Sequence, residues 1–294
     1  EEAGLEALAA SLGVTSRHLR RVMSAQFGAS PIQIAQTGRL LAARRLLNET
    51  ALPVTEIAFA SGFRSLRRFN HTMKERYGAP PSQMRGRKAM QRGESFTVSL
   101  SPRGDYAFAP MLQFLAARAL TGVELGGAKT YARTLKWGDA AGWIEIGFGA
   151  KGLMLTLSEN LAPHLRPLVA NVRGAFDLDA EMTSVDAHLA ADAEFNADVR
   201  REPAVRVPGA LDGFETAIRA VLGQQVTVAG ARTLTERLVK AFGAPLEHAP
   251  EGLTHLFPAA SALAEAGPSA IAKIGVPLKR AETLHALARA SAEG

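Results

Sequence analysis

The N-terminal part of the chain contains one helical pattern twice, and this repeat constrains the fold more than any other feature. Ala9 and Gly13 are followed 49 residues later by Ala58 and Gly62, each pair within an apolar helical sequence. A small Ala lets a second helix approach closely, and Gly adopts the positive φ of a tight corner. Each copy is therefore expected to form two short helices joined by a turn at Gly.

An apolar stripe follows each of these turns. Its members are Leu19, Val22, Met23 and Phe27 in the first copy and Phe69, Met73 and Tyr77 in the second. Each stripe is expected to form one apolar face of a helix, with Thr15 or Ser16 capping a helix of the first copy and Thr55 one of the second. A helix from Ile34 to Leu47 connects the copies, so that two recognition helices can enter successive major grooves about 34 Å apart.

Charge divides the chain after this repeat. Residues 1–92 carry 15 Lys or Arg and 6 Asp or Glu, a net charge of +9, whereas residues 93–294 carry 19 and 22, a net charge of −3. A basic block attracts polyanions at long range, although an ordinary solvated helical surface has a similar composition. The chain has no Cys, which excludes a thiolate zinc site, a Cys nucleophile and a redox pair. No apolar run approaches the ~20 residues of a membrane-spanning helix.

Three stretches of the repeat are distinctive, namely LEALAASLGVTSRHLRRV, SPIQIAQTGRLLAARRLL and VTEIAFASGFRSLRRFNHTMKERYGAPPSQMR. Together they resemble the DNA-binding module of AraC-type transcription activators, over residues 5–85. The resemblance implies that the polar residues beside the two stripes contact bases and phosphates: Ser16, Arg17, His18, Arg20, Arg21, Arg64, Ser65, Arg67 and Arg68. The alternative for each Arg is a solvated surface side chain.

The sequence period changes from residue 95 onward. Alternating apolar residues predict strands near 96–100, 131–137, 144–148 and 153–157, the last two joined by a hairpin turn at Gly149–Gly152. Helices are expected at 110–120, 184–195, 211–222, 228–242 and 278–291. The predicted fold class is multidomain α+β: an all-α double helix-turn-helix module (1–86), a linker (87–94), a small antiparallel α+β domain (95–175) and the start of an all-α domain (176–294).

Three stretches of the second half also resemble a known family, namely PMLQFLAARAL, VPGALDGFETAIRAVLGQQVTVAGARTLTERL and IGVPLKRAETLHALA. They are similar to alkylbase DNA glycosylases of the AlkA type, in the helix-hairpin-helix superfamily, whose α+β domain is TBP-like. The resemblance implies that Phe114 lines the pocket for a flipped base and that Gln225, beside Gln224, is the intercalating wedge. From the residue pattern alone, Phe114 is a core residue, and the glutamines form a polar turn after the helix-breaking Gly223.

The catalytic carboxylate of that family follows a helix-hairpin-helix, and no such hairpin occurs before Gly294. We therefore expect no catalytic residue within this sequence and no base excision by this chain, which resembles a fragment truncated at both ends. The carboxylates on the predicted helices, Asp212, Glu215, Glu236 and Glu282, are expected to face solvent. The Cys-rich zinc domain that accepts methyl groups in adaptive-response regulators is absent from this sequence, so zinc is expected only in a possible upstream domain.

The two resemblances together imply a bacterial, cytoplasmic repair protein in which an Ada-like transcription regulator is fused to a 3-methyladenine DNA glycosylase. Its expected partner is double-stranded DNA, both promoter sites and alkylated lesions, with no cofactor, no membrane and no evident protein partner. The alternative is an AraC-type regulator whose C-terminal half is a non-enzymatic ligand-sensing domain. An aromatic pocket for base stacking favours the first interpretation, and a closed apolar cavity favours the second.

Overall fold

The computed structural model describes residues 2–49, 52–84, 95–149 and 152–293. The chain divides into two compact units, Glu1–Gly93 and Glu94–Gly294, and each is described by itself. The predicted linker at 87–94 lies outside the described residues. Within the described parts, no helix is both long enough and apolar enough to cross a membrane.

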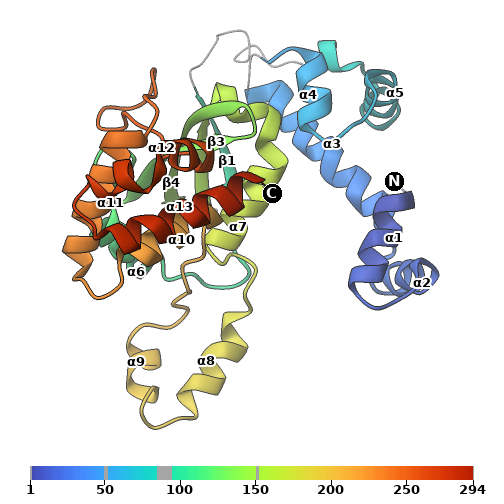
Figure 1. Cartoon of the computed structure of the whole chain (residues 1–294). Helices are drawn as coiled ribbons and strands as arrows, with labels where there is room; N and C mark the ends of the chain where they lie inside the picture. The colour runs from blue at the N-terminus through green and yellow to red at the C-terminus, as the bar shows by residue number, and fades with distance from the viewer. Residues whose placement is uncertain (1, 50–51, 85–94, 150–151, 294) are drawn as a thin grey trace. The chain divides into compact units, whose positions relative to one another are not determined.

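Unit 1 is all-helical, and both copies of the repeat form helix-turn-helix pairs (Figure 1). Its elements are α1 (Glu2–Ser11), α2 (Ser16–Phe27), α3 (Pro31–Glu49), α4 (Val54–Ala60), α5 (Leu66–Tyr77) and the short 3-10 helix η1 (Pro81–Gln83). The long helix α3 carries α1 and α2 at one end and α4 and α5 at the other. Gly13 and Gly62 adopt the expected positive φ, 67° and 83°.

The helix caps of unit 1 follow the sequence in part. Thr15 caps α2, since its hydroxyl oxygen accepts a hydrogen bond from the His18 N–H at 3.2 Å. The predicted cap at Thr55 is wrong, because α4 begins one residue earlier, at Val54, and has no side-chain cap. Pro53 precedes that helix with a φ of −53°, and a proline ring fixes φ near the helical value without a capping side chain.

The two copies of the repeat differ in burial although their patterns match. Phe69 and Met73 of α5 are fully buried, whereas Val22 and Phe27 of α2 are 40% and 69% exposed. The α2 stripe therefore forms no buried core, since α2 has no buried residue. The reason lies in α3, whose buried residues Leu40, Ala43, Leu46 and Leu47 all belong to its C-terminal half, the half that leads into α4.

Unit 2 begins with a five-stranded antiparallel sheet. Its strands are β1 (Ser95–Leu100), β2 (Glu124–Gly126), β3 (Thr130–Trp137), β4 (Ala140–Gly149) and β5 (Gly152–Ser158), in the spatial order β1-β5-β4-β3-β2. The predicted hairpin is confirmed by the pairing of Gly149 with Gly152, and its two turn residues lie outside the described residues. The edge strand β2 was not predicted, since three residues are too few to show an alternating pattern.

One helix of unit 2, α6 (Phe108–Arg118), lies between β1 and β2, and the others follow β5. They are the 3-10 helix η3 (Glu159–His164), α7 (Leu165–Ala175), α8 (Met182–Ala190), α9 (Asn196–Arg201), α10 (Gly213–Leu222), α11 (Val228–Phe242), α12 (Ala260–Ala272) and α13 (Leu278–Glu293). The predicted helix at 184–195 is wrong in extent, because α8 ends at Ala190. Asp192 then forms a turn, accepting a hydrogen bond from the Glu194 N–H at 2.8 Å, which ends the helix.

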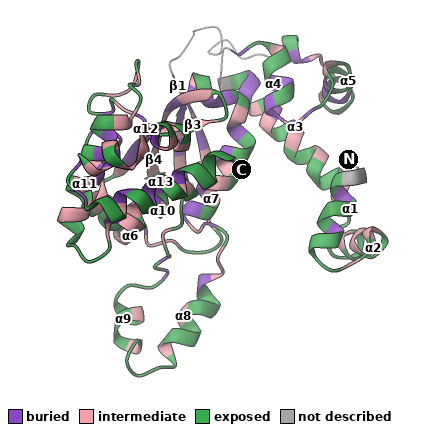
Figure 2. Cartoon of the chain, in the orientation of Figure 1, coloured by how far each residue is buried: buried purple, intermediate pink, exposed green. Residues whose placement is uncertain are grey.

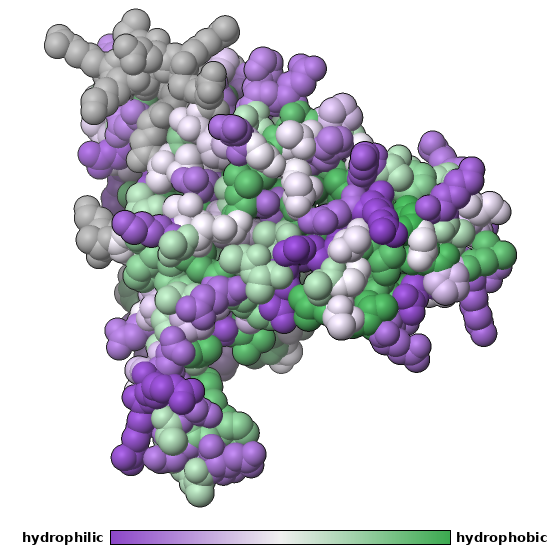
Figure 3. Space-filling view, turned by 90° about the vertical axis from the view of Figure 1, so that its left-hand side faces the viewer, coloured by the Kyte–Doolittle hydropathy of each residue, from purple (hydrophilic) through white to green (hydrophobic). Residues whose placement is uncertain are grey.

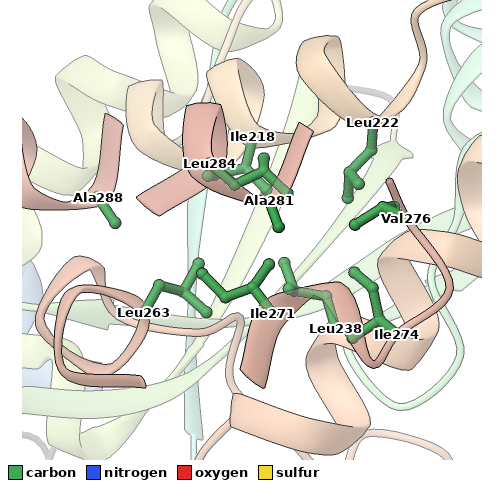
Figure 4. Packing of buried hydrophobic residues seen from close by; sticks show 10 residues of the cluster. All are labelled: Ile218, Leu222, Leu238, Leu263, Ile271, Ile274, Val276, Ala281, Leu284 and Ala288. Carbon is green, nitrogen blue, oxygen red and sulfur yellow. The ribbon is translucent and has the colours of Figure 1, made fainter. Parts of the chain in front are cut away.

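The last four helices surround one apolar cluster. Its members are Ile218 and Leu222 of α10, Leu238 of α11, Leu263 and Ile271 of α12, Ile274 and Val276 of the following turn, and Ala281, Leu284 and Ala288 of α13 (Figure 4). Removing one such buried Leu or Ile side chain typically costs about 2–5 kcal/mol. This cluster therefore fixes α10 and α11, the two helices that flank the candidate wedge.

Helices α8 and α9 project from the remainder of unit 2, and most of their surface is exposed (Figure 2). Figure 3 shows this projection in the lower part of the view, where hydrophobic and hydrophilic residues are mixed on its surface. Val185, Leu189 and Phe195 are between 37% and 45% exposed. At the base of the projection the buried Arg206 donates hydrogen bonds to the carbonyl oxygens of Asp105 and Asp177, at 2.8 and 2.5 Å, and joins two loops.

Candidate nucleic-acid interface and base-recognition site

The predicted DNA-contacting residues of unit 1 lie on and beside the recognition helices α2 and α5. Seven of them are exposed, namely Arg17, His18, Arg21, Arg64, Ser65, Arg67 and Arg68, whereas Ser16 and Arg20 are half-buried. The Ser65 hydroxyl oxygen accepts a hydrogen bond from the Arg68 N–H at 3.4 Å, so it caps α5. The basic side chains thus gather at the N-terminal halves of both helices, the ends that face base edges in helix-turn-helix proteins.

A strained corner joins α10 to α11. Helix α10 ends at Leu222, and Gly223 keeps a φ of −81°, so the chain reversal falls on Gln225, whose φ is +58°. A non-glycine residue in this region costs of order 1 kcal/mol and persists only where its surroundings enforce it. Gln224 and Gln225 are both exposed, as expected for a corner between helices.

Neighbouring groups hold this corner in place. The Gln224 carbonyl oxygen accepts a hydrogen bond from the Arg280 guanidinium of α13 at 3.1 Å. Thr227 caps α11, because its hydroxyl oxygen accepts a hydrogen bond from the Gly230 N–H at 3.1 Å. The corner is therefore preorganised on both sides of Gln225, which leaves the Gln225 side chain accessible to a partner.

Phe114 lies on the exposed side of α6. Its ring is 40% exposed, and the Arg118 guanidinium lies over it at 3.8 Å from the ring centroid. The interpretation of Phe114 as a core residue is wrong, because the buried face of α6 consists of Phe108, Met111 and Leu112. The guanidinium thus covers part of the ring, and the exposed remainder of this aromatic side chain is able to contact a planar base.

Four buried or partly buried charges join the sheet to α10. Arg133 of β3 donates a hydrogen bond to Glu215 of α10 at 2.5 Å and lies 3.6 Å from Glu124 of β2. Arg219 of α10 donates to both carboxylates at 3.0 Å. The prediction that Glu215 faces solvent is wrong, since it is only 3% exposed. Sequence reasoning missed this cluster because its members are far apart along the chain.

The pKa values in the cluster favour the ionised pairs. Burial raises the pKa of Glu215, but Arg133 and Arg219 outweigh that effect and hold the Glu215 pKa below its ordinary value of 4.5. Burial likewise opposes the charge of Arg133, and the nearby Glu215, Tyr131 and Glu124 keep the Arg133 pKa well above its usual range. Burial raises the pKa of Tyr131, whose hydroxyl donates to Glu124 at 2.5 Å. The Glu215 carboxylate is therefore held in its ionised form by its arginine partners.

A cavity of about 310 Å³ lies where α6 approaches the corner. Arg118 of α6, Arg219 of α10 and Arg232 of α11 line it, together with Gly223 and Val226 of the corner. The Arg219 guanidinium is bound by Glu124, Glu215 and the Arg118 carbonyl oxygen, so Arg118 and Arg232 are the lining residues whose charge suits an anionic ligand such as a DNA backbone. Among the described residues, no three His, Asp or Glu side chains gather in a way that would hold a metal ion.

The other three predicted carboxylates have different settings. Asp212 caps α10 by accepting a hydrogen bond from the Glu215 N–H at 2.9 Å. Glu236 is partly buried and accepts hydrogen bonds from the Thr121 N–H and hydroxyl at 3.1 and 2.8 Å. Asp212 and Glu282 are both exposed, as the helical pattern indicated, whereas Glu236 is only partly so.

Comparison with known families matches three segments of the chain. Residues 8–87 match a helix-turn-helix domain, residues 97–212 the AlkA N-terminal domain, and residues 218–292 the HhH-GPD superfamily of base excision DNA repair proteins. DNA-3-methyladenine glycosylase 2 of Escherichia coli is 37% identical over 201 residues, which cover 68% of this chain and 68% of that protein. The chain belongs to the AlkA family.

A second relative matches nearly the whole chain. The probable bifunctional transcriptional activator/DNA repair enzyme AlkA of Mycobacterium tuberculosis is 36% identical over 99% of this chain, which spans 59% of that protein. In structure, the chain is similar to a 3-methyladenine DNA glycosylase from Archaeoglobus fulgidus, with a TM-score of 0.54, 16% identity and 66% of each chain covered. These matches confirm the predicted fold class and favour a repair protein over a ligand-sensing domain.

The buried cluster predicts how the stability of unit 2 depends on pH. Because the folded state lowers the Glu215 pKa, its ionisation stabilises the protein above pH 4.5, and this contribution is lost as the pH falls below that value. Replacing Glu215 with Gln leaves buried arginines less well paired, and should lower the free energy of unfolding at pH 7 by roughly 3–5 kcal/mol. Urea denaturation at pH 7 and at pH 4 measures this loss and its reduction at low pH.

A matched control is Glu282→Gln, which removes an exposed carboxylate of α13 and should change the free energy of unfolding by no more than about 0.5 kcal/mol. If Glu215→Gln loses as much stability between pH 7 and pH 4 as the unaltered chain, then the ionisation of Glu215 does not contribute to stability as described.

Proposed function

We propose that this chain recognises DNA through both of its units and that the whole protein removes alkylated bases from DNA while regulating transcription. The names of the E. coli and M. tuberculosis relatives support this function. The single observation that carries it is the strained, exposed corner at Gln225, because a glycosylase must extrude a nucleotide and fill the gap in the stack from such a corner.

Unit 2 supplies two parts of a base-extrusion site. Gln225 enters the duplex as a wedge, and Gln224 flanks it. Phe114 offers an aromatic face on which a cationic, alkylated purine stacks, and its exposure of 40% leaves that face accessible. The arginines around the adjoining cavity, Arg118 and Arg232, attract the phosphates that border the lesion.

We further propose that this chain binds DNA without excising a base. Alkylation at purine N3 or N7 already makes the base a good leaving group, so the enzyme has to supply chiefly a carboxylate beside the developing positive charge of the sugar. Among the described residues of unit 2, the buried carboxylates are Glu124 and Glu215, and both are bound by arginines. The catalytic carboxylate is therefore assigned to a segment outside residues 93–294.

Unit 1 is assigned to promoter DNA. If Arg20 of α2 and Arg68 of α5 contact phosphates or bases, then changing both to Ala removes two cationic contacts. The slope of log affinity against log salt concentration should become less negative by about 2, because each phosphate contact contributes ~0.9 to this slope. Binding to a promoter duplex at several salt concentrations measures the slope.

The control removes the same charge elsewhere, by changing Arg200 and Arg201 of α9 to Ala. This variant should keep the slope of the unaltered chain. Equal slopes for the Arg20/Arg68 variant and the unaltered chain would remove these two residues from the DNA interface.

Gln225 is tested with a duplex that contains an abasic-site analogue. Gln225→Ala should weaken binding to this duplex at least fivefold and leave binding to undamaged duplex unchanged, because the wedge fills a gap that only the damaged duplex offers. Thermal unfolding should change little, since the side chain is exposed. Unfolding of unit 2 by this substitution, with no selective loss of binding, would make Gln225 a structural corner only.

Base excision is tested directly on methylated duplex DNA. The chain should release no more 3-methyladenine than the DNA loses spontaneously. The reason is that, among its described residues, the buried carboxylates are bound by arginines. A heat-denatured sample of the chain provides the background. Release well above this background would place the catalytic carboxylate within residues 93–294, and Asp212→Asn and Glu236→Gln would then identify it.

A further inference from the structure

Arg219 connects the candidate wedge to the candidate base pocket, and the inference drawn from it rests on the function proposed above. Its Nη1 donates hydrogen bonds at 3.0 Å to Glu124 Oε2 and Glu215 Oε1. Its Nη2 donates at 2.6 Å to the carbonyl oxygen of Arg118, the last residue of α6. One guanidinium therefore joins β2, α10 and the end of α6.

The α6 side of this connection leads to the aromatic ring. Arg118 donates a hydrogen bond from Nη1 to the Phe114 carbonyl oxygen at 3.2 Å, and its guanidinium lies 3.8 Å from the Phe114 ring centroid. The last turn of α6 and the Phe114 ring thus form one assembly. Arg219 anchors this assembly through the Arg118 carbonyl.

The α10 side leads to the corner. The Arg219 carbonyl oxygen accepts a hydrogen bond from the Gly223 N–H at 2.9 Å, one helical turn later. Gln225, with its φ of +58°, follows two residues beyond Gly223. Arg219 therefore bonds to the corner through its backbone and to α6 through its side chain.

We propose that Arg219 is a positioning residue, which sets the Phe114 ring and the Gln225 wedge in register so that a base extruded by one is received by the other. It touches neither the base nor the sugar itself. A planar guanidinium has separate N–H groups for two carboxylates and a carbonyl, whereas the single ammonium of Lys is a compact charge that does not reproduce this fork. Replacement by Lys thus preserves the charge of the cluster and removes the connection to α6.

Arg133 provides a matched control from the same cluster. It is buried, is paired with Glu215 and lies 3.6 Å from Glu124, and its Nε donates a hydrogen bond at 3.1 Å to the Thr134 carbonyl oxygen within its own strand. None of these contacts of Arg133 reaches α6 or the corner. Arg133→Lys therefore disturbs the buried charges without disturbing the connection between ring and wedge.

The experiment measures the binding of the full chain to two duplexes of one sequence, with and without an abasic-site analogue. A 2-aminopurine beside the site reports its unstacking by fluorescence. Arg219→Lys should reduce the preference for the abasic duplex at least fivefold and abolish the rise in fluorescence, whereas Arg133→Lys should keep both. In the Gln225→Ala background, Arg219→Lys should cause no further loss of preference, because the two residues act in one step.

Each outcome decides a separate point. If the unaltered chain has no preference for the abasic duplex, the proposed function fails, and the role of Arg219 fails with it. If the chain has the preference and Arg219→Lys retains it, or if Arg133→Lys loses it equally, the cluster only stabilises the fold and the positioning role alone is overturned. Should Arg219→Lys not fold by circular dichroism, the charge-balanced pair Arg219→Gln with Glu124→Gln replaces it, and the same two outcomes apply.

Discussion

The buried charges shared by the sheet and α10 determine the arrangement of unit 2. Removing an ion from water is costly, and the cost is offset only when partners stand at hydrogen-bonding distance. Arg133 meets this condition with Glu215 at 2.5 Å, and Arg219 meets it with Glu124 and Glu215 at 3.0 Å. Because such pairs tolerate little displacement, the orientation of α10 relative to β2 and β3 is fixed by them.

Because α10 is held in this orientation, the position of the corner that follows it is fixed as well. Gln225 holds a positive φ that an isolated peptide would rarely adopt, and the apolar cluster around Ile218 and Leu238 keeps both flanking helices in place. Strain at an exposed residue has no benefit for stability. Its persistence here is consistent with a side chain that is presented to a partner.

In unit 1 the same sequence pattern occurs twice, and the residues of the two copies are buried to different extents. The stripes of α2 and α5 have the same spacing, but only that of α5 is covered within this unit, where Phe69 and Met73 are fully buried. The pattern determines which residues share a helix face. Whether that face is buried depends on a third helix, α3. The C-terminal half of α3 covers only the second copy.

The sequence by itself determined the features that depend on neighbouring residues. The turns at Gly13 and Gly62, the Thr15 cap and the β4–β5 hairpin follow from local backbone preferences and side-chain spacing. The family resemblance added Phe114 and Gln225 as candidate site residues, and the structure adds that both are exposed.

Only the tertiary structure decided which charges are buried and what they join. The bond between Arg133 and Glu215 spans 82 residues, and that between Arg219 and the Arg118 carbonyl spans 101. Helical spacing assigned Glu215 to solvent because periodicity describes one helix at a time and contains no information on the strand that packs against it. The burial of Glu215 and the contacts of Arg219 arise from that packing, where a charge becomes stable only in the presence of its distant partner.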